Sequence, residues 1–159
     1  QFMPSSWRRL AVDFDGDGKI DLINNPVDAI GSIANYFNAN GWKTGEPVVV
    51  RARITSQDYD GIISKDLKAA NTLGEIAKKG LAPREAASYL ASTPASAIRL
   101  QGDNGGEFWL GFTNFYVITT YNRSIMYAMA AFQLSQELKT AREAELASTT
   151  ATALPAETP

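Results

Sequence analysis

Three aspartates at alternating positions near the start of the chain are the residues best placed to do chemistry. Asp13, Asp15 and Asp17 are followed by Gly18, where the backbone can turn sharply. Their carboxylates fall on the first, third and fifth positions of a loop that presents oxygen atoms to one point. Hard cations such as calcium bind oxygen ligands in this arrangement. The pattern therefore predicts an EF-hand-like calcium loop over residues 13–28.

Further groups could complete this loop. Lys19 offers a backbone carbonyl at the next ligand position, and Asp21 can reach the ion directly or through water. Asn24 stands where the usual loop has a bidentate glutamate, so Asp28 is the nearest carboxylate that could close the site. The alternatives are that Asp28 only caps a helix and that Asp-Gly-Asp-Gly is an ordinary polar turn.

A helix is predicted directly after the loop. Asn25 suits its N-cap, Pro26 suits its first turn, and Asp28 stands at the third helical position. Gly41 is placed to end the helix. Apolar residues follow one helical stripe, comprising Val27, Ile30, Ile33, Ala34 and Phe37.

The composition excludes several classes of function. The 159 residues include no histidine and no cysteine, which removes a Ser-His-Asp triad, thiol chemistry and the commonest zinc ligands. A net charge of -2 argues against nucleic-acid binding. No apolar run is long enough to span a bilayer. Catalysis within the chain would have to use carboxylates, tyrosine, lysine or amides.

The rest of the chain predicts a β-rich unit followed by helix. Residues 47–55 have the β-branched texture of a strand, residues 61–63 suggest a second short strand, and residues 97–100 and 107–112 suggest two more. Thr72 and Glu75 have the spacing of a capping box that begins a short helix. After Asn122 the texture is helical to about residue 147, and residues 148–159 are predicted to be a disordered tail. The predicted helix has a broad apolar face, which comprises Ile125, Met126, Met129, Ala130, Phe132, Leu134 and Leu138.

Aromatic and amide side chains gather in two parts of the sequence. One group is Gln1, Phe2 and Met3 with Tyr36, and the other is Asn114, Phe115 and Tyr116 with Tyr121, Asn122 and Tyr127. Tyrosine rings stack on sugar faces, and amides pair with sugar hydroxyls and N-acetyl groups. The alternative is that these aromatics are half-buried core residues. A glycosidase also needs a carboxylic acid of raised pKa, and no convincing candidate is found among these residues.

The sequence resembles the B family of lytic murein transglycosylases. The resemblance lies in residues 1–6 (Gln-Phe-Met-Pro-Ser-Ser), 11–18, 25–37, 114–122 and 127–129, and it extends from residue 1 to about residue 140. It implies an α+β fold in which residues 1–46 and 111–147 form the second part of a lysozyme-like helical core carrying the calcium loop. Residues 47–110 would then form a small β-rich insertion.

The resemblance also implies an activity. Members of that family are peptidoglycan lyases that cleave the β-1,4 bond between N-acetylmuramic acid and N-acetylglucosamine. Water is not the nucleophile, and the product has a 1,6-anhydromuramoyl end. A single glutamate acts as acid and then as base. The resemblance places that glutamate upstream of residue 1, so the chain is expected to be a C-terminal part of such an enzyme and inactive alone.

Site residues follow from the same resemblance. The substrate-binding set is Gln1, Phe2, Met3, Tyr36, Tyr121, Asn122 and Tyr127. The set for a structural calcium ion is Asp13, Asp15, Asp17, the carbonyl of Lys19, and Asp28.

The expected partners are peptidoglycan glycan strands and the missing N-terminal part of the same enzyme. The expected location is the periplasm, either in solution or tethered to the outer membrane through an N-terminus outside this sequence. The alternative function is a non-catalytic, calcium-stabilised module that binds glycan or protein. A dockerin or a calcium sensor would need a second loop of the same kind, and the sequence has one.

Overall fold

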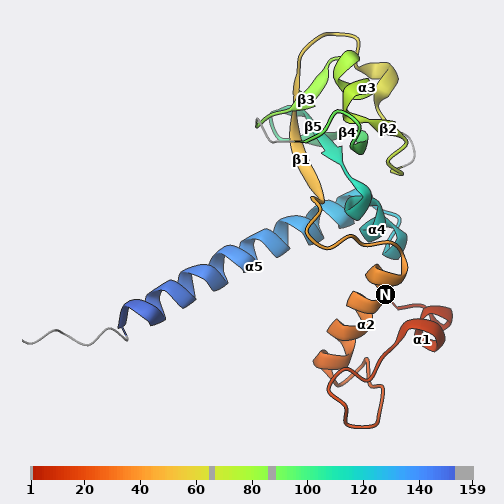
Figure 1. The fold of residues 1–159 in the computed structure, drawn as a ribbon, viewed down its shortest axis with the longest axis vertical. Coiled ribbons are helices and arrows are strands. Elements are labelled where there is room, and N and C mark those ends of the chain that lie inside the picture. Colours follow the sequence, from red (N-terminus) through yellow and green to blue (C-terminus); the bar gives the residue numbers. More distant parts are fainter. Residues whose placement is uncertain (1, 65–66, 86–88, 153–159) are drawn as a thin grey trace, which may run out of the picture. The chain divides into compact units, whose positions relative to one another are not determined.

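The computed structural model describes residues 2–64, 67–85 and 89–152, with side chains as far as Thr149 (Figure 1). The chain separates into two compact units, residues 1–123 and 124–159, and each is described by itself. Both helices and strands are present, as the sequence predicts.

In the first unit, two helices lie on either side of the aspartate-rich loop that begins at Asp13, called the acidic loop below. Helix α1 spans Pro4–Leu10 and helix α2 spans Pro26–Ala39. The side chain of Asn25 accepts hydrogen bonds from the amides of Val27 and Asp28, which confirms the predicted N-cap. Gly41 follows α2 with a φ of 91°, a left-handed conformation that favours glycine, so the predicted helix end is also confirmed.

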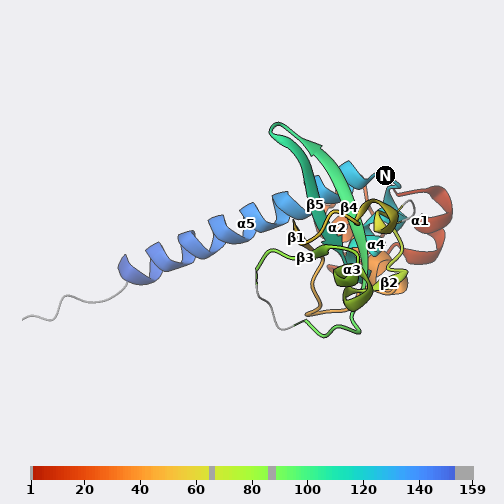
Figure 2. The same ribbon diagram turned by 90° about the horizontal axis from the view of Figure 1, so that it is seen from above.

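A five-stranded antiparallel sheet with strand order β2-β4-β5-β1-β3 forms the middle of the first unit. Its longest pairing is the β4–β5 hairpin, which Figure 2 shows clearly. The strands are β1 Val49–Ile54, β2 Asn71–Thr72, β3 Leu81–Pro83, β4 Pro94–Gly102 and β5 Gly105–Gly111. These strands lie where the sequence predicts a β-rich unit.

Helix α3, Leu73–Lys78, covers one face of this sheet. Thr72 accepts a hydrogen bond from the Glu75 amide while the Glu75 carboxylate accepts one from the Thr72 amide, which confirms the capping box. The buried core between helix and sheet includes Leu73, Ile76, Leu81, Ala95, Ala97, Leu110 and Phe112.

One predicted strand is wrong. Residues Asp60–Ile62 form the short 3-10 helix η1, and Ile63 contributes a single parallel bridge to Ala97. The physical reason is local: the amide of Ile62 bonds to the Tyr59 carbonyl, so the chain curls after the preceding turn and does not extend.

Helix α4, Thr113–Tyr121, follows β5 and is fixed to the segment before β1 by one buried amide. Asn114 is fully buried, and its Nδ2 donates to the carbonyls of Lys43 (2.8 Å) and Glu46 (2.9 Å). Its Oδ1 accepts from the Lys43 amide at 2.8 Å. The Asn114 side chain, called the Asn114 anchor below, therefore links the segment before β1 to the start of α4, which follows β5.

The second unit contains helix α5, Ile125–Thr152. The helix expected to end near residue 147 continues to Thr152, so the predicted boundary of a disordered tail at residue 148 is wrong, and residues 153–159 lie outside the described part. Good helix formers such as Glu143, Ala144 and Glu145 run up to that boundary. Of the predicted apolar face Met129 is buried with Ala128, whereas Met126, Leu134 and Leu138 are exposed.

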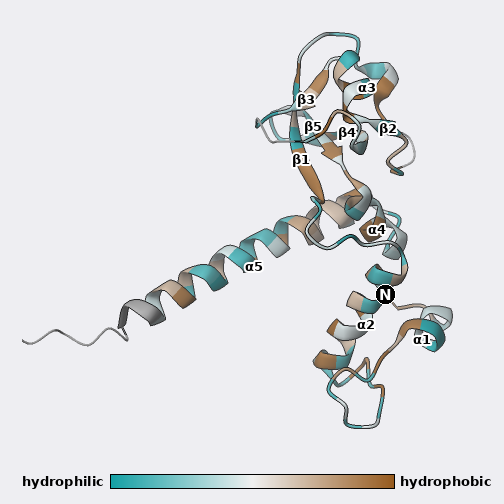
Figure 3. Cartoon of the chain, viewed as in Figure 1, coloured by the Kyte–Doolittle hydropathy of each residue, from teal (hydrophilic) through white to brown (hydrophobic). Residues whose placement is uncertain are grey.

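Hydropathy follows these elements. Figure 3 shows hydrophobic residues on α4 and at the start of β1, and a mixture of hydrophilic and hydrophobic residues along α5. Among the described residues, no helix has both the length and the apolar character needed to cross a bilayer.

The Asn114 anchor leads to a first prediction. Asn114→Ala should lower the free energy of unfolding by about 2–4 kcal/mol, because the Lys43 amide and the Glu46 carbonyl lose their recorded partner and the Lys43 carbonyl keeps only the Glu46 amide. Urea denaturation would measure this. Asn38→Ala, at an exposed position of α2, is the matched control and should change stability by less than about 0.5 kcal/mol. Equal effects of the two variants would contradict the role of the anchor.

Candidate functional site

The first carboxylate of the acidic loop, that of Asp13, accepts several hydrogen bonds from the backbone of the loop. Asp13 accepts hydrogen bonds from the amides of Gly16 (2.7 Å), Asp17 (3.2 Å) and Gly18 (2.8 Å). Gly16 and Gly18 have φ values of 77° and 88°, which residues with a Cβ rarely adopt. The glycines of the motif therefore let the chain wrap around the Asp13 carboxylate.

Asp28 closes the loop from helix α2. Its side chain is fully buried, and its two oxygens accept from the amides of Phe14 and Asp21, both at 2.8 Å. These amides lie on either side of the turn, so one carboxylate ties the beginning of the loop to its end. The position near the N-terminus of α2 also favours a negative charge.

The inward face of α2 is small and polar, which the sequence analysis missed. Ser32 is fully buried and its Oγ accepts from the Val12 amide at 2.9 Å, while Asn35 donates to the Leu10 carbonyl at 2.9 Å. Gly31 is buried against the ring of Phe14. The signal was available as a second helical stripe, Asp28, Gly31, Ser32 and Asn35.

The apolar stripe that the sequence predicts on α2 lies on a different face of the helix from the residues that contact the loop. Val27 and Ile30 are 43% and 68% exposed, so within the described residues this stripe is not the face that packs on the loop. The loop backbone needs hydrogen-bond acceptors and a close approach, which polar and small residues supply.

Three carboxylates converge in this loop. Asp13, Asp15 and Asp28 each offer an oxygen within 4.8 Å of the others. Oxygens bound at about 2.4 Å from one calcium ion lie at most about 5 Å apart, so the spacing and the all-oxygen donor set fit calcium. The same spacing holds negative charges close together, and a divalent cation would offset their repulsion.

The remaining proposed ligands are placed differently. Asp17 is not part of the three-carboxylate group; its Oδ1 accepts from the Lys19 amide at 2.8 Å. Asp21 accepts from the amides of Ile23 and Asn24 and from the Asn24 side chain. The Asn24 amide, with help from the Asn24 side chain and Ile23, holds the pKa of Asp21 below its usual value. Asp21 therefore shapes the turn between the loop and α2.

A cluster of aromatic rings brings together three predicted substrate-binding residues. The ring centroids of Phe2 and Tyr36 are 6.0 Å apart, those of Tyr36 and Tyr121 are 5.3 Å apart, and those of Phe2 and Tyr121 are 6.4 Å apart. The Tyr36 hydroxyl donates to the Thr120 carbonyl at 2.9 Å. Segments from the chain start, α2 and α4 therefore meet here. Phe37 also contacts Tyr121, although the sequence analysis assigned Phe37 only to a helical stripe.

The other predicted substrate-binding residues have separate surroundings. Met3 is 63% exposed at the N-cap of α1, and Asn122 is an exposed residue at the C-cap of α4. Tyr127 belongs to the second unit and is 41% exposed. Gln1 lies outside the described residues.

Two carboxyl groups of the described residues have a lowered pKa. One is Asp21, and the other is Glu75, whose pKa is lowered by the Thr72 amide first and then by the Thr72 hydroxyl. A general acid needs the opposite shift. Asp21 and Glu75 are therefore unsuited to the role of general acid.

Comparison with known proteins identifies the family. Residues 1–136 match the Transglycosylase SLT domain. Membrane-bound lytic murein transglycosylase B of Escherichia coli (strain K12) is 44% identical over 142 residues, which are 89% of this chain and 37% of that protein.

Solved structures agree with this match. Soluble lytic transglycosylase SltB1 from Pseudomonas aeruginosa has a TM-score of 0.82 and 47% identity, over 90% of this chain and 46% of that one. The Escherichia coli lytic transglycosylase Slt35 in complex with calcium has a TM-score of 0.74 and 43% identity, over 89% of this chain and 43% of that one.

The chain therefore belongs to the lytic transglycosylase family, as its resemblance to the B family of lytic murein transglycosylases predicts. The predicted α+β, lysozyme-like fold class is confirmed. The chain spans less than half the length of each of these relatives.

The packing of Phe14 on Gly31 leads to a prediction. A Cβ on Gly31 would overlap the Cβ and Cγ of Phe14. Gly31→Ala should therefore lower the free energy of unfolding by about 1–2 kcal/mol, the overpacking cost less the gain in helix propensity. Thermal or urea denaturation would measure it.

The compensating double variant is the control. In the background of Phe14→Gly both overlapping atoms are gone, so adding Gly31→Ala should stabilise the protein by up to about 1 kcal/mol. Destabilisation of the same size in both backgrounds would show that Phe14 is not the reason for glycine.

Proposed function

We propose that this chain is part of a peptidoglycan lytic transglycosylase that cleaves the bond between N-acetylmuramic acid and N-acetylglucosamine and forms 1,6-anhydromuramoyl ends. Family membership supports the activity class. The observation that carries the proposal is the convergence of Phe2, Tyr36 and Tyr121 from three separate segments. Such a cluster presents ring faces and edges to an uncharged glycan.

The residues of this chain act by binding and orienting the substrate. Tyr36 is fixed by its hydrogen bond to the Thr120 carbonyl, so its ring is held in one orientation. Asn122 is exposed beside Tyr121 in sequence, and its amide can pair with a sugar hydroxyl or an N-acetyl group. Phe2, Met3 and Tyr127, with Gln1, complete the proposed substrate-binding set.

The catalytic acid and base is proposed to be a glutamate upstream of residue 1. Because the muramoyl oxygen attacks in place of water, a single carboxyl group can protonate the leaving oxygen and then accept the proton of the nucleophile. The lowered pKa values of Asp21 and Glu75 make these two carboxylates unsuited to that role.

The acidic loop is proposed to bind one structural calcium ion. Asp13, Asp15 and Asp28 would supply carboxylate oxygens, with Asp17 and the Lys19 carbonyl as further ligands. The calcium complex of the relative Slt35 supports this assignment. A bound ion would neutralise the clustered charges and hold α2 against the loop, which positions Tyr36 on the same helix.

The proposed location is the periplasm, because peptidoglycan is the substrate. The name of the E. coli relative, a membrane-bound murein transglycosylase, supports this location.

A binding experiment tests the proposed function. The chain should sediment with purified peptidoglycan sacculi, and Asn122→Ala should weaken that binding about 5- to 10-fold through loss of one or two hydrogen bonds. Asn38→Ala is the control with an exposed asparagine and should bind normally. Muropeptide analysis of the same samples should show no anhydromuropeptides, and their release by this chain would mean that one of its own carboxyl groups is the acid.

Calcium should stabilise the chain. At a free concentration about 100 times the dissociation constant, the ion should add about 2.7 kcal/mol to the free energy of unfolding. Thermal melts with added calcium and with a chelator would measure the difference. Asp13→Asn should abolish most of the increment, whereas Asp103→Asn, an exposed residue of the β4–β5 turn, should retain it. A melting temperature indifferent to chelation would remove calcium from the proposal.

A further inference from the structure

The backbone turn after α2 places the Trp42 ring on the last turn of that helix. The Gly41 amide donates to the Asn38 carbonyl at 3.1 Å, and Gly41 has a φ of 91°. The Trp42 amide donates to the Phe37 carbonyl at 3.0 Å. Together these bonds form a Schellman motif, in which the residue after the glycine contacts the end of the helix. The contact here is between two rings: the centroids of Trp42 and Phe37 are 5.5 Å apart, and their planes are 15° from parallel.

The backbone is also fixed on the other side of Trp42. The Asn114 anchor holds both peptide groups of Lys43, since it accepts from the Lys43 amide at 2.8 Å and donates to the Lys43 carbonyl at 2.8 Å. Trp42 therefore lies between the Schellman motif of α2 and a side chain of α4. A residue whose backbone is held at both ends loses little further conformational entropy when its ring stacks.

Phe37 connects Trp42 to the aromatic cluster of Phe2, Tyr36 and Tyr121. The ring centroids of Phe37 and Tyr121 are 6.3 Å apart, and the two planes meet at 85°. The ring centroids of Tyr36 and Tyr121 are 5.3 Å apart, and those planes meet at 88°. Both are T-shaped contacts, a geometry that aromatic pairs favour. Two successive residues of α2 therefore hold the Tyr121 ring.

The two neighbours of Tyr121 are themselves fixed in different ways. The Tyr36 hydroxyl donates to the Thr120 carbonyl at 2.9 Å, so a hydrogen bond orients that ring. Phe37 has no polar group on its side chain, and packing alone orients its ring. Among the described residues, the rings in contact with Phe37 are those of Tyr36, Tyr121 and Trp42. Because Trp42 is fixed from outside the aromatic cluster, its stacking sets the position of Phe37.

We propose that Trp42 is a positioning residue for glycan binding. Its ring fixes Phe37, and Phe37 holds Tyr121 and the following Asn122 in the orientation that binds the glycan. A surface that is ordered before the ligand arrives loses less entropy on binding. Trp42 is partly buried and acts through Phe37, so it needs no contact of its own with a sugar. This inference rests on the proposed function, which assigns Tyr121 and Asn122 to the substrate-binding set.

The test compares Trp42→Leu with Trp42→Phe. Leucine keeps an apolar side chain beside Phe37 but cannot stack as a flat ring, whereas phenylalanine can. Both variants bury less apolar area, so both should be less stable than the unaltered chain. Trp42→Leu should weaken sedimentation with purified peptidoglycan sacculi about 3- to 10-fold, and Trp42→Phe should retain binding to within about twofold. Amide spectra of the ¹⁵N-labelled variants would establish that both are folded at the temperature used.

The Tyr121 ring supplies a second readout, which a general loss of stability would not change. The chemical shifts of its ring protons depend on the positions of the neighbouring rings. In the folded chain without any ligand, Trp42→Leu should displace these shifts more than Trp42→Phe does. Selective labelling of tyrosine rings would measure them.

A double-mutant cycle tests whether Trp42 acts through Tyr121. In the background of Tyr121→Ala, adding Trp42→Leu should cause no further loss of sacculi binding, because the ring that Trp42 positions is already absent. The same fold loss in both backgrounds would show that Trp42 acts independently of Tyr121 and would overturn the proposal.

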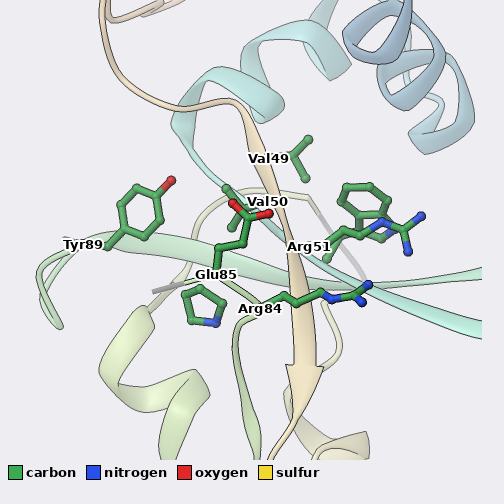
Figure 4. A pocket seen from close by; sticks show the side chains of 8 residues that line it. Val49, Val50, Arg51, Arg84, Glu85 and Tyr89 are labelled. Carbon is green, nitrogen blue, oxygen red and sulfur yellow. The ribbon is translucent and has the colours of Figure 1, made fainter. Parts of the chain in front are cut away.

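Tyr89→Leu is the matched control. Its ring centroid is 5.2 Å from that of Phe112, so this variant also removes a contact between two rings. Tyr89 lines a different feature of the first unit, the cavity of about 380 Å³ beside β1 (Figure 4). Tyr89→Leu should lower stability and leave sacculi binding unchanged. Equal weakening by Trp42→Leu and Tyr89→Leu, equal weakening by Trp42→Leu and Trp42→Phe, or unchanged binding by Trp42→Leu would each overturn the proposal.

The two readouts separate this proposal from the proposed function. If the unaltered chain does not sediment with sacculi, the proposed glycan surface is wrong, while displaced Tyr121 shifts in Trp42→Leu would still support the positioning of that ring by Trp42. If Asn122→Ala weakens sacculi binding but Trp42→Leu changes neither binding nor the Tyr121 shifts, the positioning role is wrong and the proposed function stands.

Discussion

The buried carboxylate of Asp28 is the interaction on which the first part of the structure depends. A buried charge is costly unless it is compensated, and here two backbone amides of the loop and the N-terminal end of α2 compensate it. These hydrogen bonds also fix the geometry of the loop, because the backbone amides of Phe14 and Asp21 must both approach the Asp28 side chain. The loop is thereby folded onto the helix even before an ion is considered. The carboxylates of Asp13 and Asp15 then lie close enough to Asp28 for the negative charges to repel one another. A bound cation would offset this repulsion.

Local features of this arrangement could be predicted from the sequence, because each depends on a few neighbouring residues. The Asn25 cap, the glycine after α2 and the Thr72–Glu75 capping box are confirmed since their hydrogen bonds close within one turn. The spacing of the aspartates similarly fixes the loop. The wrong strand prediction at residues 61–63 also has a local cause. A run of glycine and isoleucine is compatible with a strand or with a 3-10 helix, and the hydrogen bond from the Ile62 amide to the Tyr59 carbonyl favours the helix.

Long-range features could not be predicted in this way. Helix α2 has two stripes, one apolar and one small and polar, and hydrophobicity alone favours the apolar one. The structure uses the polar stripe because the partner is a loop whose amides need acceptors at close range. The aromatic cluster likewise depends on three segments meeting. Residue types and spacing could name Phe2, Tyr36 and Tyr121 as candidates, and only the family resemblance assigned all three to one set. From the sequence, Asn114 is assigned only to a group of aromatic and amide residues suited to sugars. The structure instead buries its amide, which satisfies three peptide groups.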